Sequence, residues 1–586
     1  MDDDQDRPTD TFFIIPHTHW EGAVFKTREE YLEMGLPNIL VALDLLGKHP
    51  GYRFTLDQSC YVEPFIQRYP EEGEALRGFV REGRLEIAGG THVMPDVNMP
   101  GGESFIRQVL YGRGFFRREI GVDVSTAWLL DTFGHHPQMP QLLRLSGYRF
   151  LWFFRGVEGW DVPSEFVWEG IDGSRIPAIW LPRGYAIAYG SPGSLPDFSE
   201  FIEERFRKLD SFTRGNSRAG PAGADVCRPE EHLPRLIEEY NRRPGRAFDL
   251  LLSTPSDYER AVEACSDDLK VFGGELNPIF QGTYSSRIEL KQLTRKLEGM
   301  IGVVEKLGAI LQSLGKCVDN DRPWLAWEPL LFNHAHDLMS GVMTDRVYGE
   351  VMGNYGLSLE LAGEEIECRM RDLSSMIDTR GEGIPIVVFN PLGWSRTDPV
   401  EVELDLGDET LAGLRLVGPD GKFIPLQLLS PAEGTDKIAF IAGEVPPLGH
   451  SIYRLVRGDS AENIPQSTPG EKAVLENRFY RIEIEPATGA VQQIKVRNGE
   501  WDALDGQGNV VAVEEDNGDF WELYRPLDGG SRIAMKDIHP PPRLGEAAFS
   551  TDRAEAPGRV MHGPVFSEFT LSHSLGEYGR FDTRIR

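Results

Sequence analysis

Short apolar runs alternate with helical stretches over roughly the first 280 residues, and this alternation limits the possible folds most. TFFIIPH (11–17) is an apolar run with a polar tip, which is typical of a strand buried in a parallel sheet. A helical stretch at 27–47 follows it. Further strands are expected at 83–90, 125–131, 148–154, 176–182 and 248–253. Because strands alternating with helices form mainly parallel sheets, residues 1–283 are predicted to form an α/β domain.

The pattern changes twice after this domain. Helical periods at 286–315, 324–340 and 345–379 predict a helical bundle over 284–380. From residue 384 onward, short alternating strands separated by Gly, Pro and Asp turns predict β-sandwich architecture. We therefore expect a multidomain chain, as its 586 residues also suggest. The expected C-terminal parts are a small β-sandwich at 381–458, a linker at 460–473 and the start of a larger β domain at 470–586. The last residues, FDTRIR, have a strand-like pattern, so this last domain is expected to be truncated.

Charge and composition exclude several classes of partner. The net charge is −31 and the sequence pI is about 4.9, which argues against binding to nucleic acid or to an anionic membrane. The first residues, MDDDQDRPTD, lack the basic and apolar parts of a secretory signal, and no membrane span is expected. Five widely spaced cysteines without a CxxC pair predict neither a disulfide framework nor a cysteine zinc site. A cytoplasmic protein is expected; a homo-oligomer is compatible with the sequence.

Three separated segments are rich in metal-ligand residue types. In HTHWE, an extended chain would point His19 and Glu21 the same way, so that both could reach one ion. Asp131 follows an apolar strand, where it could be a catalytic carboxylate or the N-cap of a helix. NHAHD (333–337) could supply a further ligand or simply begin a helix. Together the three segments offer a mixed nitrogen and oxygen donor set that suits zinc or a similar divalent cation.

A second carboxyl group is available for acid–base chemistry. Glu275 lies in the segment GGEL, and with Asp131 it would make a pair of carboxyl groups. Retaining glycosidases need two such groups about 5 Å apart. The spacing along the chain does not give the distance between them.

Five ordered segments resemble the signature segments of the α-mannosidases of glycoside hydrolase family 38. They are PHTHWE, GGTHVMPDVNMPGGESFIRQ, WLLDTFGHHPQMPQLL, GTYSSR and NHAHDLMSG. The resemblance runs from about residue 12 to the chain end. It implies an α/β domain, a three-helix bundle and β domains. It also implies a zinc ion that binds two sugar hydroxyls, and retaining double displacement on a mannose-containing oligosaccharide or glycoside.

The resemblance also assigns roles to residues. It makes Asp131 both a metal ligand and the nucleophile, which is physically sensible because a cation keeps a carboxylate ionised and oriented. The implied metal ligands are His19, Glu21, Asp131 and His336.

Other residues would act on the sugar or on the nucleophile. Phe133 would flank the metal-bound sugar, and Arg155 would keep Asp131 ionised and aligned. Asp337 would hydrogen-bond the sugar or the metal shell. Glu275 is the expected general acid/base, with Asp96 as the reserve candidate.

The chain departs from the family pattern at two positions. The family usually has Asp where Glu21 stands. The Glu side chain is longer by one methylene, so either the metal must shift or the backbone must retract. It commonly has Trp, part of the sugar-binding wall, where this chain has Val24. Two alternative functions stay open. One is a catalytically inactive carbohydrate-binding relative, which these departures favour. The other is a metal-dependent carbohydrate deacetylase, which also uses His and Asp ligands, although no TFDDG-like segment is evident.

Overall fold

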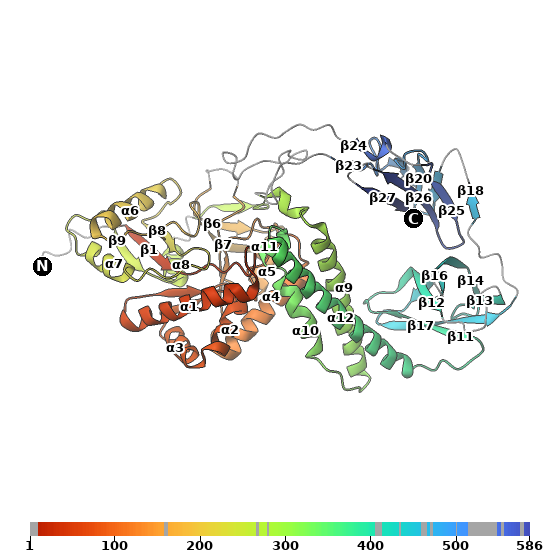
Figure 1. The fold of residues 1–586 in the computed structure, drawn as a ribbon, viewed down its shortest axis with the longest axis horizontal. Coiled ribbons are helices and arrows are strands. Elements are labelled where there is room, and N and C mark those ends of the chain that lie inside the picture. The colour runs from red at the N-terminus through yellow and green to blue at the C-terminus, as the bar shows by residue number, and fades with distance from the viewer. Residues whose placement is uncertain are drawn as a thin grey trace. The chain divides into compact units, whose positions relative to one another are not determined.

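The computed structural model divides the described residues into two compact units (Figure 1). The first contains the residues up to Val304 together with Asp319–Glu365, and the second contains Glu305–Val318 and the residues from Ile366 onward. The predicted linker at 460–473 lies outside the described residues except for 466–468 and Ala473. The described residues are 10–157, 162–264, 269–277, 280–404, 413–432, 435–458, 466–468, 473–499, 501–513, 548–552, 556–574 and 579–586.

Strand β1 (Thr11–Pro16) is the central strand of the first sheet. It lies between β8 (Ser217–Ala222) and β9 (Asp249–Leu252) and is parallel to both. The apolar run FFII is buried, as expected for a strand with helices on both faces. Just beyond β1, His17 bridges to Thr55 in β2 (Phe54–Leu56), which pairs in parallel with β3 (Leu85–Ile87).

A second sheet has the order β10-β6-β7-β5-β4. All of its neighbouring strands are parallel except the antiparallel pair β6–β7, so the mainly parallel prediction is confirmed. The strands β2, β6, β8 and β10 were not predicted. β2 and β10 are short, and β8 reads SRAGPA, with Gly and Pro in place of an apolar run. The bounds are β4 Thr126–Leu129, β5 Phe150–Phe153, β6 Glu165–Glu169, β7 Arg175–Trp180 and β10 Val271–Gly273.

Helices cover these strands. Helix α1 begins with a capping box between Thr27 and Glu30, which satisfies the free backbone N–H groups of its first turn. Side chains of α6 and α7 share one core cluster with β1, β8 and β9. The helices are α1 Arg28–Lys48, α2 Ser59–Arg68, α3 Pro70–Arg81, α4 Gly102–Phe115, α5 Met139–Leu145, α6 Leu195–Lys208, α7 Leu233–Asn241 and α8 Pro255–Glu263.

Three long helices follow in the chain and contact one another: α9 (Ile288–Ser313), α10 (Arg322–Phe332) and α12 (Asp345–Ser375). The Thr294 and Tyr355 hydroxyls are 2.8 Å apart, joining α9 to α12. The Ser358 hydroxyl donates to the Ala326 carbonyl at 2.9 Å, joining α12 to α10.

The single helix predicted over 324–340 is wrong. Helix α10 ends at Phe332, and a separate short helix, α11, spans His336–Ser340. The physical reason is tertiary: the backbone N–H of His336 donates to the carbonyl of Met94 at 3.1 Å rather than to a carbonyl of the preceding turn.

The second unit contains antiparallel β-sheets. Two of them share one buried core that includes Leu416, Ile438, Phe440 and Leu455, which is sandwich architecture as predicted. One sheet contains β11 Ile384–Asn390, β17 Gly449–Arg457, β13 Leu414–Val417 and β14 Phe423–Ile424, and the other contains β12 Arg396–Leu404, β16 Thr435–Val445 and β15 Leu426–Ala432.

A further β core forms around Leu475, Ile484, Val560 and Phe569. Among the described helices, none is long and apolar enough to cross a membrane. The strands are β18 Gln466–Thr468, β19 Ala473–Glu476, β20 Tyr480–Ile484, β21 Val491–Val496, β22 Trp501–Asp502, β23 Ala512–Val513, β24 Ala548–Phe549, β25 Arg559–His562, β26 Ser567–Ser574 and β27 Arg580–Ile585.

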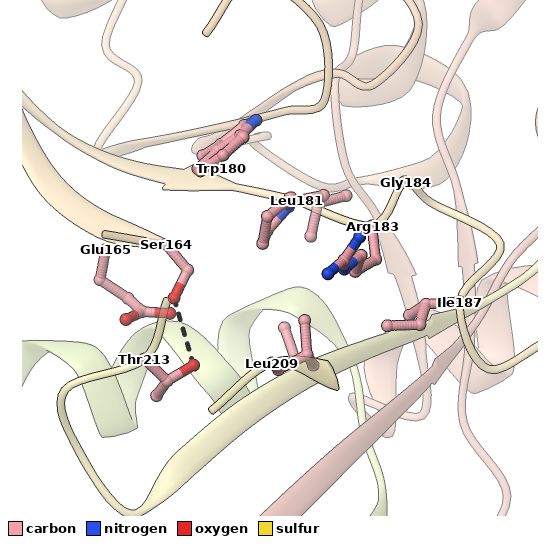
Figure 2. Close-up of a pocket in the computed structure, with 11 residues that line it drawn as sticks. Ser164, Glu165, Trp180, Leu181, Arg183, Gly184, Ile187, Leu209 and Thr213 are labelled. Atoms are coloured by element: carbon pink, nitrogen blue, oxygen red, sulfur yellow. Dashed lines mark hydrogen bonds between the residues drawn. The ribbon is translucent and has the colours of Figure 1, made fainter. Parts of the chain in front are cut away.

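A small cavity lies beside the end of β7 (Figure 2). Its lining includes Trp180, Leu181 and Leu209, and the Ser164 and Thr213 hydroxyls meet there at 3.3 Å. The cavity volume is about 10 Å³, which is room for about one water molecule. It is therefore too small to bind a sugar.

One buried carboxyl group lies between α8 and the second sheet. Glu259 is 6% exposed, and its Oε1 accepts hydrogen bonds from the Thr126 hydroxyl at 2.8 Å and the Trp152 indole at 2.9 Å. Burial raises the pKa of Glu259 from 4.5 to about 7, with Glu86 adding to the shift. As pH rises, Glu259 loses its proton at a lower pH in the unfolded chain than in the folded one. The free energy of unfolding therefore falls progressively between about pH 4.5 and 7.

We predict that Glu259→Gln stabilises the protein relative to wild type, and that it does so more at pH 8 than at pH 5. Glutamine keeps an acceptor for Thr126 and Trp152 but carries no charge to bury. The variant's stability advantage over wild type should grow by about 2 kcal/mol between the two pH values, measured by thermal unfolding. Glu263→Gln, at an exposed position of the same helix, is the matched control. A Glu259→Gln advantage that is the same at both pH values would contradict the prediction.

Candidate active site

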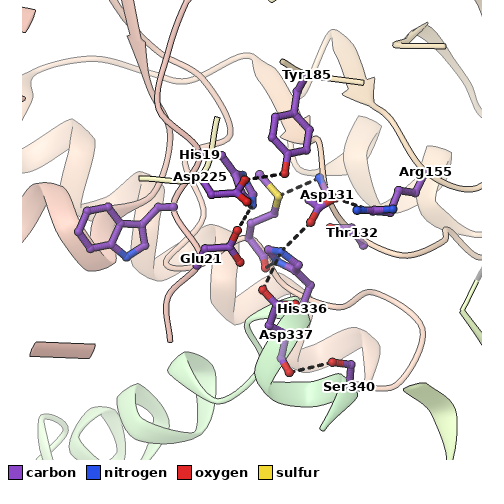
Figure 3. A network of polar contacts seen from close by, with 12 residues as sticks. His19, Glu21, Asp131, Thr132, Arg155, Tyr185, Asp225, His336, Asp337 and Ser340 are labelled. Carbon is purple, nitrogen blue, oxygen red and sulfur yellow. Dashed lines mark hydrogen bonds and ion pairs between the residues drawn. The ribbon is translucent and has the colours of Figure 1, made fainter. Parts of the chain in front are cut away.

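Polar side chains gather at the carboxyl ends of the parallel strands of the first unit (Figure 3). His19 follows β1, Asp131 follows β4, Arg155 follows β5 and Asp225 follows β8. The carboxyl ends of parallel strands lie at one edge of a sheet, which is where α/β proteins form their sites. Helix α11 adds His336 and Asp337 to the same network.

Three buried side chains offer metal-ligand atoms at one point. Ligand atoms of His19, Glu21 and His336 all lie within 4.8 Å of one another. His19 Nε2 is 3.8 Å from Glu21 Oε1. Asp131, the fourth predicted ligand, lies outside this group of three, but its Oδ2 is 3.6 Å from His336 Nε2. The structure thus brings together all four residues that the sequence predicted to share an ion.

The two histidines are arranged to offer nitrogen lone pairs. The Nδ1 of His336 lies 3.0 Å from the Met94 carbonyl, to which it donates, and this leaves Nε2 facing the site. Burial lowers the pKa of His19 to about 4, so its imidazole is neutral at physiological pH. A neutral imidazole is the form that binds a metal.

The carboxyl groups of Glu21 and Asp337 lack compensating charge. Burial, followed by the neighbouring Asp337, raises the pKa of Glu21 well above its usual range. Burial likewise raises the pKa of Asp337 to about 7. Among the described residues, His19 Nε2, His336 Nε2 and Asp337 Oδ2 are buried without a hydrogen-bond partner. Burial disfavours the charged form of His336, but Asp131 more than offsets this and raises the pKa of His336 above its usual value, so only His19 is held neutral by its surroundings. Imidazole nitrogens beside under-compensated carboxyl groups form a donor set that fits a divalent cation.

Asp131 is held ionised by its neighbours. The Arg155 Nε donates to Asp131 Oδ1 at 2.5 Å. Burial alone would raise the pKa of Asp131, but Arg155 and His336 hold it well below its usual range. The Arg155 guanidinium lies 5.6, 5.0 and 4.8 Å from the ring centres of Phe133, Phe154 and Phe280.

Phe133 also contacts the metal-ligand cluster. It is 2% exposed, and its ring meets that of His336 at 5.4 Å in an edge-to-face arrangement. Phe133 therefore lies between Arg155 and His336, and its role in flanking a metal-bound sugar stays a prediction.

Asp225 and Tyr185 belong to the site although the sequence did not single them out. The Tyr185 hydroxyl donates to Asp225 Oδ1 at 2.8 Å, and the Tyr185 ring is 4.9 Å from that of His19. Backbone bonds on either side of Asp225 tie its loop to His19. The available signal was a polar residue just past a strand, but the strand itself, β8, was not recognised.

The two predicted proton donors lie in different surroundings. Asp96 is 3% exposed, and its Oδ1 accepts from the backbone N–H groups of Asn98 and Met99, both at 2.8 Å, so the carboxylate closes its own turn. Glu275 is exposed, and among the described residues it forms no hydrogen bond or ion pair with Asp131. Its neighbour Leu276 pairs with the backbone of His135 instead.

The two departures from the family pattern have structural outcomes. Glu21 is 8% exposed, and its longer side chain still reaches the histidines. Val24 is 2% exposed, and its carbonyl accepts from the Thr344 backbone N–H at 3.0 Å. Val24 therefore packs into the protein and does not replace an aromatic sugar-binding wall.

Comparison with known proteins agrees with this geometry. The chain is 26% identical to human Alpha-mannosidase 2C1 over 543 residues, covering 88% of this chain and 47% of that protein. It is 27% identical to Alpha-mannosidase from Saccharomyces cerevisiae over 389 residues, covering 62% of this chain and 34% of that protein. The chain thus spans about half or less of the length of these curated relatives.

A solved structure and two family matches complete the comparison. The crystal structure of an alpha-mannosidase from Enterococcus faecalis V583 superposes with a TM-score of 0.82 at 21% identity, covering 96% of this chain and 67% of that one, and so shares its fold. Residues 10–275 match the Glycosyl hydrolases family 38 N-terminal domain, and residues 278–373 match the Alpha mannosidase middle domain. Together these two matches span more than half of the sequence, and the chain belongs to glycoside hydrolase family 38.

Proposed function

We propose that this chain carries the active site of a retaining, metal-dependent α-mannosidase. The observation that supports this most is the buried group of His19, Glu21 and His336 beside an ionised Asp131. Relatives that match most of the chain are named α-mannosidases. The expected substrate is therefore a mannose-containing glycoside.

The proposed metal is zinc, held by His19, Glu21, Asp131 and His336. Two nitrogen and two oxygen donors are a common zinc ligand set. When bound, the ion would supply positive charge that anchors sugar hydroxyls over Asp131. Asp337, buried beside His336, is proposed to hydrogen-bond the sugar or a metal ligand.

In the first half of the reaction, the Asp131 carboxylate would attack the anomeric carbon. A carbon–oxygen bond forms to Asp131 while the glycosidic carbon–oxygen bond breaks, and a general acid protonates the departing oxygen. Arg155 keeps Asp131 unprotonated and aligned through its hydrogen bond. In the second half, the same acid, now a base, takes a proton from the water that displaces Asp131, so that the configuration is retained.

The proton donor has two main candidates, Asp225 and Glu275. Asp225 lies in the network with Tyr185 and next to His19, and its carboxyl is exposed to an approaching substrate. Glu275 is exposed but, among the described residues, forms no hydrogen bond or ion pair with the network. We therefore favour Asp225 and keep Glu275 as the alternative, with buried Asp96 third because its oxygen is already engaged in its own turn.

Removing a histidine should remove the metal. His19→Ala or His336→Ala is expected to weaken zinc binding at least about tenfold, because each variant deletes one nitrogen donor. Metal content after dialysis would be measured by elemental analysis. Turnover of a chromogenic α-mannoside should vanish with chelator and return with added zinc.

The matched control is His232→Ala, a histidine of the same unit that bonds Ser191 outside the cluster. Its zinc content should equal that of wild type. Turnover that persists after complete metal removal would contradict the proposal. Glycan binding without turnover would favour the carbohydrate-binding alternative. Release of acetate from acetylated sugars would favour the deacetylase alternative.

Variants of the carboxyl groups should separate nucleophile from proton donor. Asp131→Ala is expected to lower turnover of every α-mannoside by on the order of 10³-fold or more. Asp225→Ala should lower turnover by about 10²–10⁴-fold for a poor leaving group, and much less for a dinitrophenyl mannoside, which needs no protonation.

Glu275→Ala, measured on the same pair of mannosides, distinguishes the two candidates. If Glu275→Ala shows the leaving-group dependence and Asp225→Ala does not, Glu275 is the acid and our preference is wrong. Full activity of Asp131→Ala would refute the mechanism itself.

A further inference from the structure

We infer that Gln58 is a positioning residue that sets the spacing between the two chain segments carrying the metal-ligand histidines. The inference rests on the metal site of the proposed function. Gln58 is 1% exposed and lies two residues beyond the carboxyl end of β2. It does not itself contact the ligand atoms, so any effect must pass through the backbone.

The Gln58 side chain joins two backbones that are distant in sequence. Its Nε2 donates to the Trp20 carbonyl at 3.1 Å, and Trp20 stands between His19 and Glu21. Its Oε1 accepts from the Met94 backbone N–H at 2.7 Å. One planar amide thus fixes the ligand segment 19–21 relative to the segment around Met94.

Met94 passes this constraint to the remaining ligands. Its carbonyl accepts from both the backbone N–H and the ring Nδ1 of His336, at 3.1 and 3.0 Å. Its sulfur accepts from the backbone N–H of Asp131 at 3.4 Å. The path from Gln58 therefore reaches His19 and Glu21 on one side and His336 and Asp131 on the other.

The surroundings of Gln58 leave it little freedom to move. Its Nε2 also donates to Asp57 Oδ2 at 3.1 Å, and Asp57 Oδ1 accepts from the Tyr61 hydroxyl at 2.7 Å. The Tyr61 ring stacks on the Trp20 indole at 4.6 Å. A Cβ atom at Gly35 would lie 2.3 Å from Trp20, so the indole fills its space completely.

Only a side chain with an N–H donor and an oxygen acceptor at this length can make both backbone contacts. Methionine has similar volume and neither group. An ionised glutamate keeps the acceptor for Met94 but offers no N–H to the Trp20 carbonyl, and it places a second carboxyl group beside Asp57. Both substitutions therefore break the contact with Trp20, one by removing the amide and the other by replacing its donor with an oxygen.

The experiment measures metal binding by the whole chain. Zinc affinity would be determined by competition with a chromogenic chelator, and ligand geometry by the visible absorption of the cobalt(II)-substituted protein. Gln58→Met is expected to weaken zinc binding by about tenfold, as supporting hydrogen bonds around metal ligands commonly do, and to change the cobalt spectrum. Gln58→Glu, which turns the donor to Trp20 into an oxygen beside the Asp57 carboxyl, is expected to weaken zinc binding at least as much, and it tests the inference by itself if Gln58→Met does not fold.

Asn241→Leu is the matched control. Asn241 is also an amide that donates to and accepts from backbone, bonding the O and N of Leu250 at 2.8 and 2.9 Å, within the same unit. The Asn241→Leu variant should bind zinc with the same affinity as wild type. Wild-type affinity and spectrum in both Gln58 variants would overturn the inference, as would an equal loss in Asn241→Leu, which would indicate general loosening. Absence of zinc binding by wild type would instead refute the metal site, and the inference with it.

Discussion

Carboxyl groups buried where β1, β4 and helix α11 meet are the constraint on which the arrangement of the first unit depends. Glu21, Asp131 and Asp337 are each less than a tenth exposed. Arg155 compensates Asp131, but the raised pKa values of Glu21 and Asp337 show that their charge is not fully offset by protein groups. Buried carboxylates are costly unless a proton or a cation joins them. Histidines with free nitrogens at the same point make a cation the chemically suited partner.

The sequence predicted the parts of this site that follow from local geometry. His19 and Glu21 share a side because side chains in an extended chain alternate, and His19 and Asp131 both lie at the carboxyl ends of predicted strands, whereas Arg155 was assigned only through the family resemblance. His336 could be added only through the family resemblance, since nothing local links residue 336 to residue 19. The structure supplies that link through the carbonyl of Met94.

The parts that could not be predicted depend on contacts between distant residues. The break between α10 and α11 exists because Met94 takes a backbone hydrogen bond from His336, which no helical period can reveal. Asp225 was overlooked because β8 is built from Gly, Pro and Ala and is stabilised as a strand by its pairing with β1. Glu275 was chosen from its place in the chain, and its exposure depends on how Leu276 pairs with His135.

The ring of Phe133, Phe154 and Phe280 around Arg155 has a consequence for metal exchange. A guanidinium does not lose its proton at any physiological pH, and the three aromatic faces hold it in place without competing for its Nε–H. Asp131 therefore remains an anion whether or not a cation is bound nearby. At the proposed metal site, Asp131 would thus offer one anionic ligand before any ion arrives, so loading need not begin with a deprotonation at this residue.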